Sequence, residues 1–162
     1  MKKLAVMILL AATVAAAGDG PALRYNQVCQ KATHNSYQRA ESITDQLGRH
    51  QARTIEFDVH AVSPLGLPAT KGDWLTYHNR MDHKSSCRLL SDCLGLVADF
   101  NRQHPNHQII TIFFDVNQMG GPGHDRADFY RVITAAIPRE KIVKPADLMA
   151  ACPTAKTHKE AV

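Results

Sequence analysis

Four short apolar runs each place polar, chemically useful residues at or near their C-terminal end. They cover residues 30–35 (QKATHN), 54–60 (TIEFDVH), 74–79 (WLTYHN) and 109–115 (IITIFFD). In a barrel of parallel strands, the catalytic groups come from the ends of several strands and meet at one mouth. The pattern therefore predicts an α/β fold of the TIM-barrel type. Six residues would converge in it: His34, Asn35, Glu56, Asp58, His78 and Asp115.

The N-terminus has the basic, apolar and small-residue order of a secretory signal peptide. Lys2 and Lys3 precede an apolar run over 4–14, and three alanines then lead to Gly18. We expect residues 1–17 to be removed and the protein to be secreted or periplasmic. A retained membrane anchor is the alternative, but the apolar run is short for a bilayer span. No later stretch is long enough for a transmembrane span.

Charge and length narrow the class of protein. Loss of Lys2 and Lys3 lowers the formal charge from +4 to +2, which gives no basis for nucleic-acid binding. The remaining chain, about 145 residues, suits one domain, whereas a whole barrel needs roughly 250. Only four strands and a stub at 141–143 are visible in the sequence. We therefore expect the N-terminal half of a barrel over 18–149, followed by a poorly ordered tail at 150–162.

The expected elements alternate between strand and helix. The strands are those given above, and helices are expected over 42–48, 88–103 and 125–137. Each connection is long enough for a crossover, so the strands are predicted to be parallel, in sequence order, with the helices on one side.

Four cysteines in an exported chain favour disulfide bonds. Cys87 and Cys93 form the expected pair, because Cys87 would precede a helix and Cys93 would lie in its first turns. Cys29 and Cys152 would then be paired or free. A zinc site is the alternative, although no close Cys-x-x-Cys pair supports it.

The strand at 54–60 alternates between apolar and polar residues, so Glu56 and Asp58 project from the same face. Two ionised carboxylates that face a barrel interior require a cation or a base. With Asn35 and Asp115 nearby, these oxygen atoms match the preference of calcium. The alternative is an ordinary half-buried sheet, where charges on the exposed face are routine.

Histidines supply the second part of the expected site. His34 and His78 stand at strand ends, whereas a single strand-end histidine is usually a surface group. His60 lies on the same face as Glu56 and Asp58, and it is a candidate for a residue that positions the site residues without itself reacting. The remaining histidines fall in expected loops, helix ends or the tail and receive no role: His50, His83, His104, His107, His124 and His158.

Several motifs over residues 25–148 together resemble the secreted calcium-dependent phosphoinositide-specific phospholipase C family. They are THNSY at 33–37, RTIEFD at 53–58, YHN at 77–79, SC at 86–87 with DCL at 92–94, HQII at 107–110 and FD at 114–115. The resemblance implies an α/β barrel that cleaves a phosphodiester by acid/base catalysis with calcium.

The resemblance also implies roles for individual residues. His34 would act at the transferring phosphate and His78 would be the second catalytic histidine. The calcium ligands would be Asn35, Glu56 and Asp58. Asp115 occupies a position that is usually Glu, and it completes the expected metal set.

The expected chemistry is attack on phosphorus by a neighbouring inositol hydroxyl. His34 would take the hydroxyl proton and His78 would protonate the departing diacylglycerol oxygen. Calcium would offset charge on the phosphoryl oxygens. A related glycerophosphodiesterase is a variant of this hypothesis. The alternative from another class is a truncated, catalytically inactive secreted fragment that at most binds calcium or phosphoinositides.

Overall fold

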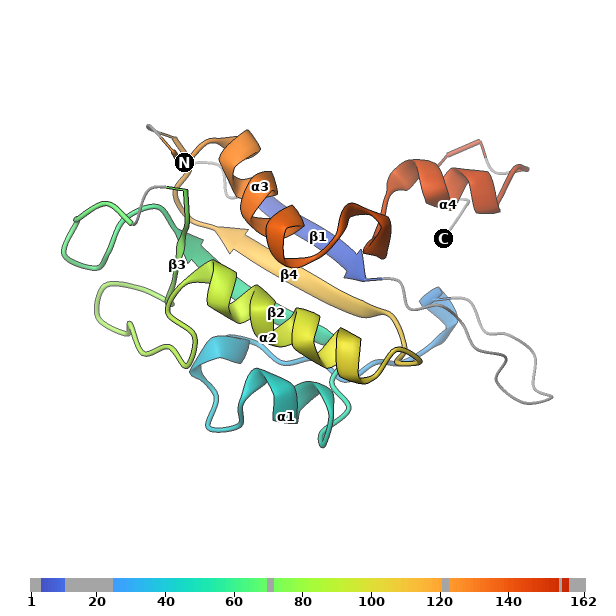
Figure 1. Cartoon of the computed structure of the whole chain (residues 1–162), viewed down its shortest axis with the longest axis horizontal. Helices are drawn as coiled ribbons and strands as arrows, with labels where there is room; N and C mark the ends of the chain where they lie inside the picture. Colours follow the sequence, from blue (N-terminus) through green and yellow to red (C-terminus); the bar gives the residue numbers. More distant parts are fainter. Residues whose placement is uncertain (1–3, 11–24, 70–71, 121–122, 155, 158–162) are drawn as a thin grey trace.

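The computed structural model describes residues 4–10, 25–69, 72–120, 123–154 and 156–157, as a mixed α/β protein with a small sheet (Figure 1). The strands are β1 (Leu4–Leu10), β2 (Thr54–His60), β3 (Leu75–Thr76), β4 (Ile110–Val116) and β5 (Ile142–Val143). The helices are α1 (Ile43–Leu47), α2 (Leu90–Gln103), α3 (Arg126–Ala136) and α4 (Pro145–Ala151). Short 3-10 turns are η1 (Tyr25–Gln27), η2 (Ser36–Gln38) and η3 (Arg139–Lys141).

The described strands form one five-stranded sheet in the order β3-β2-β4-β1-β5. Only β2 and β4 pair in parallel; the β2–β3, β4–β1 and β1–β5 pairs are antiparallel. The prediction of four parallel strands in sequence order is therefore wrong. Within the described residues, the connection from β2 to β3 holds no helix, and a parallel partner normally needs such a crossover. The expected half barrel stays a prediction.

The prediction that residues 30–35 form a strand is also wrong. This segment makes only a single parallel bridge, between Ala32 and Thr54. The backbone leaves the extended conformation at Asn35, which has a left-handed φ of 48°, and η2 begins at the next residue. This early turn places residues 33–37 against β2 as a loop.

The apolar face predicted for β2 is confirmed, and β4 shows the same alternation. Ile55, Phe57 and Val59 of β2 are fully buried in the core. In β4, Ile110, Ile112, Phe114 and Val116 are buried as well, whereas Phe113 on the other face is 39% exposed. Each buried apolar side chain contributes roughly 1.5–3 kcal/mol relative to its exposed state. The apolar face therefore fixes which side of the sheet the helices cover.

Helices α2 and α3 pack on this apolar face (Figure 1). Leu94 and Val97 of α2 join the core cluster, and Phe129 of α3 makes an edge-to-face contact with Phe114 at 5.3 Å between ring centroids. Trp74 meets the same Phe129 ring at 5.3 Å. The opposite face, which carries Glu56 and Asp58, is thereby left for the candidate site.

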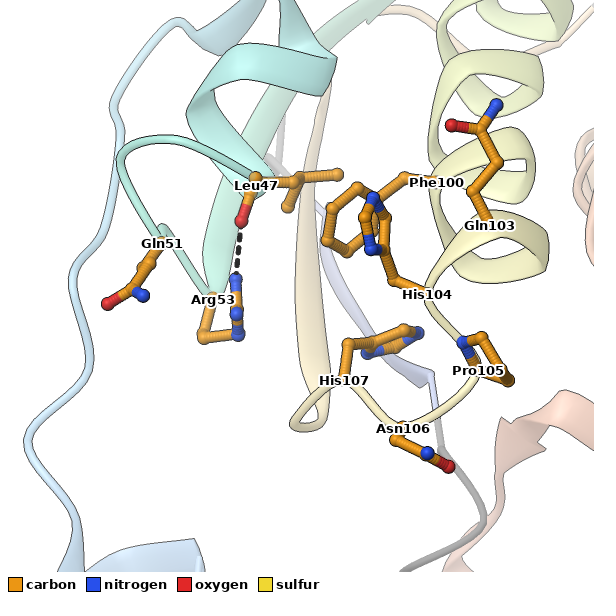
Figure 2. Close-up of a pocket in the computed structure, with 10 residues that line it drawn as sticks. Leu47, Gln51, Arg53, Phe100, Gln103, His104, Pro105, Asn106 and His107 are labelled. Carbon is orange, nitrogen blue, oxygen red and sulfur yellow. Dashed lines mark hydrogen bonds between the residues drawn. The ribbon is translucent and has the colours of Figure 1, made fainter.

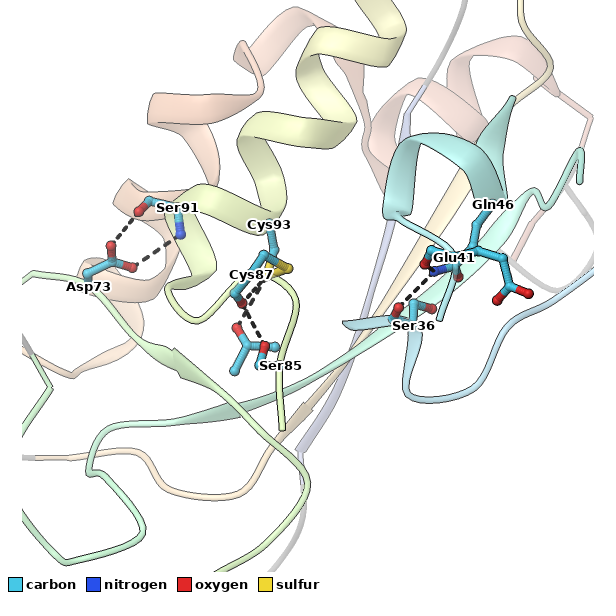
Figure 3. Close-up of a disulfide and its surroundings, with 9 residues drawn as sticks. Ser36, Glu41, Gln46, Asp73, Ser85, Cys87, Ser91 and Cys93 are labelled. Carbon is cyan, nitrogen blue, oxygen red and sulfur yellow. Dashed lines mark hydrogen bonds between the residues drawn. A yellow bond between two sulfur atoms is a disulfide. The ribbon is translucent and has the colours of Figure 1, made fainter. Parts of the chain in front are cut away.

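The N-terminus of α2 is capped by a residue that is distant in sequence. Its own N-cap position is Leu89, which offers no side-chain acceptor. Instead, the Asp73 carboxylate accepts the backbone N–H of Ser91 at 3.3 Å and the Ser91 hydroxyl (Figure 3). The contact satisfies a donor that the first turn of a helix leaves open. It ties the segment before β3 to α2.

The predicted Cys87–Cys93 disulfide is present, and it links the segment before α2 to the first turn of that helix (Figure 3). Both cysteines are buried. Cys29 is an exposed free thiol, so of the two alternatives left open for Cys29 and Cys152, paired or free, the bonded pair is not formed.

Residues Leu4–Leu10 of the expected signal peptide form β1, between β4 and β5. Residues 1–3 and 11–17 lie outside the described part of the chain, and removal of the leader stays a prediction. Helix α4 reaches Ala151, so the expected tail begins within its last turn; 155 and 158–162 lie outside the described residues. No helix in the described residues is long and apolar enough to cross a membrane.

Candidate active site

Two carboxylates lie side by side on adjacent parallel strands. Asp58 of β2 and Asp115 of β4 are register partners in the ladder. Partners in a parallel ladder project to the same face of the sheet, and this face is opposite the helices. Glu56 lies on the same face two residues before Asp58. Three acidic side chains therefore share one region near the C-terminal ends of the two strands.

The loop at 33–37 brings a histidine and an amide to these acids. The backbone N–H of Asn35 donates to Glu56 Oε2 at 3.1 Å, and His34 Nε2 lies 3.4 Å from the same oxygen. Asparagine tolerates the left-handed conformation that this turn requires. The loop is fastened because Ser36 Oγ accepts the N–H of Glu56 at 2.9 Å and donates to the Thr33 carbonyl at 3.0 Å.

Tyr37 links Asn35 to Asp58 beneath the surface. Its buried hydroxyl lies 3.1 Å from Asp58 Oδ2 and 3.3 Å from Asn35 Oδ1. Burial, reinforced by the charge of Asp58, raises the pKa of the Tyr37 hydroxyl far above its ordinary value, so it remains a donor. The motif THNSY contained this tyrosine, but sequence reasoning gave it no role.

Burial raises the pKa of Asp58, and the charges of Glu56 and Asp115 act in the same direction. The hydrogen bond from Tyr37 and the charge of His78 oppose this shift. The ionised carboxylate is therefore costly in the protein alone. A cation at this position would relieve the repulsion among the three acids.

His78 reaches the region from the segment after β3. Its side chain is 44% exposed, and Nδ1 lies 3.7 Å from Asp82 Oδ2 and 3.1 Å from Asn79 Nδ2. A charge on His78 lowers the pKa of both Asp58 and His60. His34 is much more open, with 78% of its side chain exposed.

His60 supports the backbone that carries His78. Its Nε2 lies 2.8 Å from the Tyr77 carbonyl oxygen, and its ring stacks on the Tyr77 ring at 3.8 Å between centroids. Because a carbonyl only accepts, this nitrogen carries the proton. Burial lowers the pKa of His60, so the ring is neutral at physiological pH. His60 thus positions the neighbouring chain.

The donor set suits a hard cation by its chemistry. It consists of carboxylate and amide oxygens from Asn35, Glu56, Asp58 and Asp115, which calcium prefers over nitrogen or sulfur ligands. In the described part of the chain, however, no three His, Cys, Asp or Glu side chains converge closely enough to hold a metal ion. Contacts and strand register therefore link His34, Asn35, Glu56, Asp58 and Asp115. Within these described residues a closed coordination sphere is not formed, and a common pocket that also includes His78 stays a prediction.

A pocket also lies apart from the candidate site. Its volume is about 530 Å³, and Figure 2 shows it between α2 and the segment that enters β2, lined by Arg53, Phe100, His104 and His107. Arg53 donates to the Leu47 carbonyl at 2.7 Å and thus holds the end of α1. This is the opposite end of β2 from Asp58, so the pocket is separate from the candidate site.

A smaller pocket, about 330 Å³, lies beside the candidate site. It is lined by Pro64, Leu75, Thr76, Tyr77, His83, Ser85 and Arg88. Tyr77 immediately precedes His78, and Pro64 belongs to the loop after β2. This pocket therefore lies between the two loops that follow β2 and β3, and its lining does not include the acidic residues.

Comparison with solved structures shows that the chain shares its fold with one known enzyme. No protein-family model and no curated protein matches the chain. The chain is similar to calcium-dependent phosphoinositol-specific phospholipase C from the Gram-negative bacterium Pseudomonas sp., in its apo-form myoinositol complex, with a TM-score of 0.64 and 23% identity. Two apo crystal forms of that enzyme give TM-scores of 0.63 and 0.60 at 23% and 22% identity.

These matches cover 75% of this chain and 44–45% of the solved chains. The chain therefore spans less than half the length of the structures that it resembles. At this identity the likeness shows the fold. The shared fold supports the family that the sequence motifs resemble.

Proposed function

We propose that the chain is a calcium-dependent phosphodiesterase domain that cleaves phosphoinositide-type phosphodiesters through His34 and His78. The observation that carries the proposal is the acidic group at the end of β2 and β4, where His34 Nε2 lies 3.4 Å from Glu56 Oε2 and Asp58 is the register partner of Asp115. The fold shared with phosphoinositol-specific phospholipase C supports it.

His34 is the proposed base. Its Nε2 faces Glu56 Oε2 at 3.4 Å, so the carboxylate orients the ring when Nε2 carries the proton. Nδ1 then takes the proton from the inositol hydroxyl. The hydroxyl oxygen forms a bond to phosphorus while the bond from phosphorus to the glycerol oxygen breaks.

His78 is the proposed acid. Asp82 Oδ2 lies 3.7 Å from its Nδ1 and can accept the proton that Nδ1 carries in the charged ring, so Nε2 is left to give a proton to the departing oxygen. Asn35, Glu56, Asp58 and Asp115 would hold calcium, which would offset negative charge on the phosphoryl oxygens. Tyr37 keeps Asn35 and Asp58 in place.

A second candidate is a catalytically inactive protein that at most binds calcium or phosphoinositides. The described residues contain no group of three close His, Cys, Asp or Glu side chains, and the proposed calcium-assisted catalysis needs a formed metal site.

One experiment separates the candidates. The protein is incubated with phosphatidylinositol in detergent micelles, with calcium or with a calcium chelator, and the released inositol phosphate is measured. The first candidate predicts release with calcium and loss of release with chelator. Calcium-dependent thermal stabilisation without any release would favour the second. Release that chelator leaves unchanged would contradict the calcium role.

A further inference from the structure

The pocket between α2 and the start of β2, here called the Arg53 pocket, contains a cation that the protein pairs only in part. Arg53 is half-buried, and its Nη1 donates to the carbonyl oxygens of Leu47 and Ala52 at 2.7 and 2.8 Å. Its Nε is buried and has no hydrogen-bond partner among the described residues. Support of the end of α1 accounts for the bonds of Nη1, but it leaves the rest of the guanidinium group without an acceptor.

Arg53 also lacks a negative counter-charge. Burial lowers its pKa, and no carboxylate counters this shift. No Asp or Glu of the described chain lines the Arg53 pocket. A partly buried charge without an opposite charge is costly. An anion in the pocket would remove this cost.

The other charged groups that act on this region are positive as well. His107 is buried in the wall of the pocket, and its pKa is lowered first by burial and then by three cations. These cations are Arg53, His104 when it is protonated, and Lys141 of η3. The pocket therefore lies in a positive local field.

Three acids belong to segments that adjoin the pocket, and none of them lines it. Asp45 of α1 accepts the hydroxyl of Ser42 at 2.7 Å. Asp99 of α2 forms an exposed ion pair with Arg102 at 2.6 Å. Glu140 is exposed beside Lys141. The charge of Arg53 is thus not cancelled by these acids.

The wall opposite Arg53 is built from rings. Figure 2 shows the Arg53 side chain facing Phe100, His104 and His107 across the pocket. The rings of His104 and His107 pack on Phe100 at 4.6 and 5.5 Å between centroids. His107 is already held, because its Nε2 lies 2.9 Å from Asn101 Oδ1. One wall therefore offers a positive charge, and the other offers a flat surface with apolar parts.

The size of the Arg53 pocket suits a small molecule. Its volume of about 530 Å³ lies within the usual range for such sites. A guanidinium group pairs well with the planar or tetrahedral oxygens of carboxylates and phosphates. With Nη1 committed to the two backbone carbonyls, Nη2 is left for a ligand.

We propose that the Arg53 pocket binds a small organic anion, whose carboxylate or phosphate group pairs with Arg53 and whose flat apolar part lies against the ring wall. The pocket is at the opposite end of β2 from Asp58. This inference therefore does not rest on the proposed phosphodiesterase activity.

The test is calorimetric titration of the whole chain with benzoate and with phenyl phosphate. The buffer contains no other carboxylate or phosphate and no added calcium. We expect a dissociation constant on the order of 1 mM or below for the better of the two anions, as for a small fragment with one charged contact. Which of them binds more tightly identifies the preferred anionic group. Absence of binding by both overturns the proposal.

Two further probes test the two halves of the ligand separately. Benzyl alcohol keeps the ring without the charge, and inorganic phosphate keeps the charge without the ring. Each should bind at least about tenfold more weakly than the better anion, because each loses one of the two walls. Benzyl alcohol that binds as well as benzoate would contradict the role of Arg53. Inorganic phosphate that binds as well as phenyl phosphate would contradict the role of the rings.

Nuclear magnetic resonance gives the location of binding. With the anion, the backbone amide signals of Gly48 and Gln51, which line the Arg53 pocket, should move. Those of Asp58 and Asp115, at the other end of the strands, should stay in place. Movement confined to Asp58 and Asp115 would overturn the proposal, because the anion would then occupy the candidate active site.

Variants of the pocket complete the test. Arg53→Gln should weaken binding of the better anion by at least about tenfold, since it removes a hydrogen bond to a charged group. Thermal unfolding shows whether this variant is folded, because Arg53 also holds the end of α1. Wild-type affinity in folded Arg53→Gln would leave Arg53 a purely structural role and overturn the proposal.

A second variant leaves Arg53 and its bonds to α1 unchanged. His104→Glu places a carboxylate on the exposed part of the ring wall, where it competes with the anion for Arg53. We expect it to weaken binding by about threefold or more. His83→Glu makes the same change at an exposed histidine outside the Arg53 pocket and should bind as wild type. Equal affinity in these two variants would also overturn the proposal.

Discussion

The hydroxyl of Tyr37 lies 3.1 Å from Oδ2 of Asp58, and both residues are buried below the candidate active site. This bond is the main stabilising contact of a carboxylate whose pKa is raised by burial. It also connects the loop of His34 to β2. One hydroxyl group thus links two of the proposed metal ligands, Asn35 and Asp58, and the loop that carries the proposed base.

We first predict that Asp58→Asn stabilises the protein at pH 7 in chelator, by on the order of 1 kcal/mol. The folded pKa of Asp58 is raised. Its contribution to stability is therefore fully present below its unfolded pKa, about 3.9, and is lost as the pH rises through the folded pKa. Urea unfolding at pH 3 and pH 7 measures the difference, with the more exposed Asp99→Asn as control. A variant that is less stable at pH 7 would contradict this reasoning.

Asp58→Asn should also abolish stabilisation of the protein by calcium, because it removes the negative charge of a proposed calcium ligand. Thermal unfolding with and without calcium gives this second readout. An unchanged calcium-dependent shift of the melting temperature would show that Asp58 is not a ligand.

His34→Ala and His78→Ala are each expected to lower the rate of phosphodiester cleavage by on the order of 10² or more, the scale of lost acid/base catalysis. Inositol phosphate release under saturating calcium measures it. His104→Ala, in the pocket at the other end of β2, is the control and should retain the wild-type rate. Full activity in either test variant would exclude that histidine from catalysis.

Loss of the disulfide in Cys87→Ser/Cys93→Ser should lower the free energy of unfolding by about 2 kcal/mol, because the bond restricts the unfolded chain over a short loop. Denaturant midpoints measure the change. Cys29→Ser, which alters an exposed free thiol, is the control. If a reducing agent destabilises the double variant as much as wild type, the bond is not the cause.

Asp73→Ala should cost about 1 kcal/mol, since it removes the side chain that caps α2. Asp92→Ala changes an exposed acid in the first turn of the same helix and should cost less. Unfolding curves of the two variants give the comparison, and equal effects would mean that the charge rather than the cap matters.

The exported protein is expected to begin near Gly18, as the leader pattern predicts. Cleavage there would remove β1. The edge of β4 that pairs with β1 would then lose this partner strand. Intact-mass measurement of protein recovered outside the cytoplasm gives its N-terminus. A mass that includes Leu4–Leu10 would show that this segment belongs to the mature sheet.

Local pattern was sufficient for the parts of the fold that depend on neighbouring residues. The period-two alternation determined which face of β2 and β4 is buried, because successive side chains point to opposite sides of a strand. Ser42 and Asp125 marked the starts of α1 and α3, where both now accept backbone N–H groups. The Cys87–Cys93 pair followed from closeness along the chain.

Tertiary structure alone decided how the strands pair and which groups meet. No local pattern states that β3 runs antiparallel to β2, or that 30–35 shortens to one bridge with Thr54, because pairing direction depends on contacts between distant segments. The sequence placed Glu56 and Asp58 on one face by itself. The hydroxyl of Tyr37 reaches Asp58 only because the turn at Asn35 folds back on β2, and a contact between segments that are 21 residues apart is set by packing.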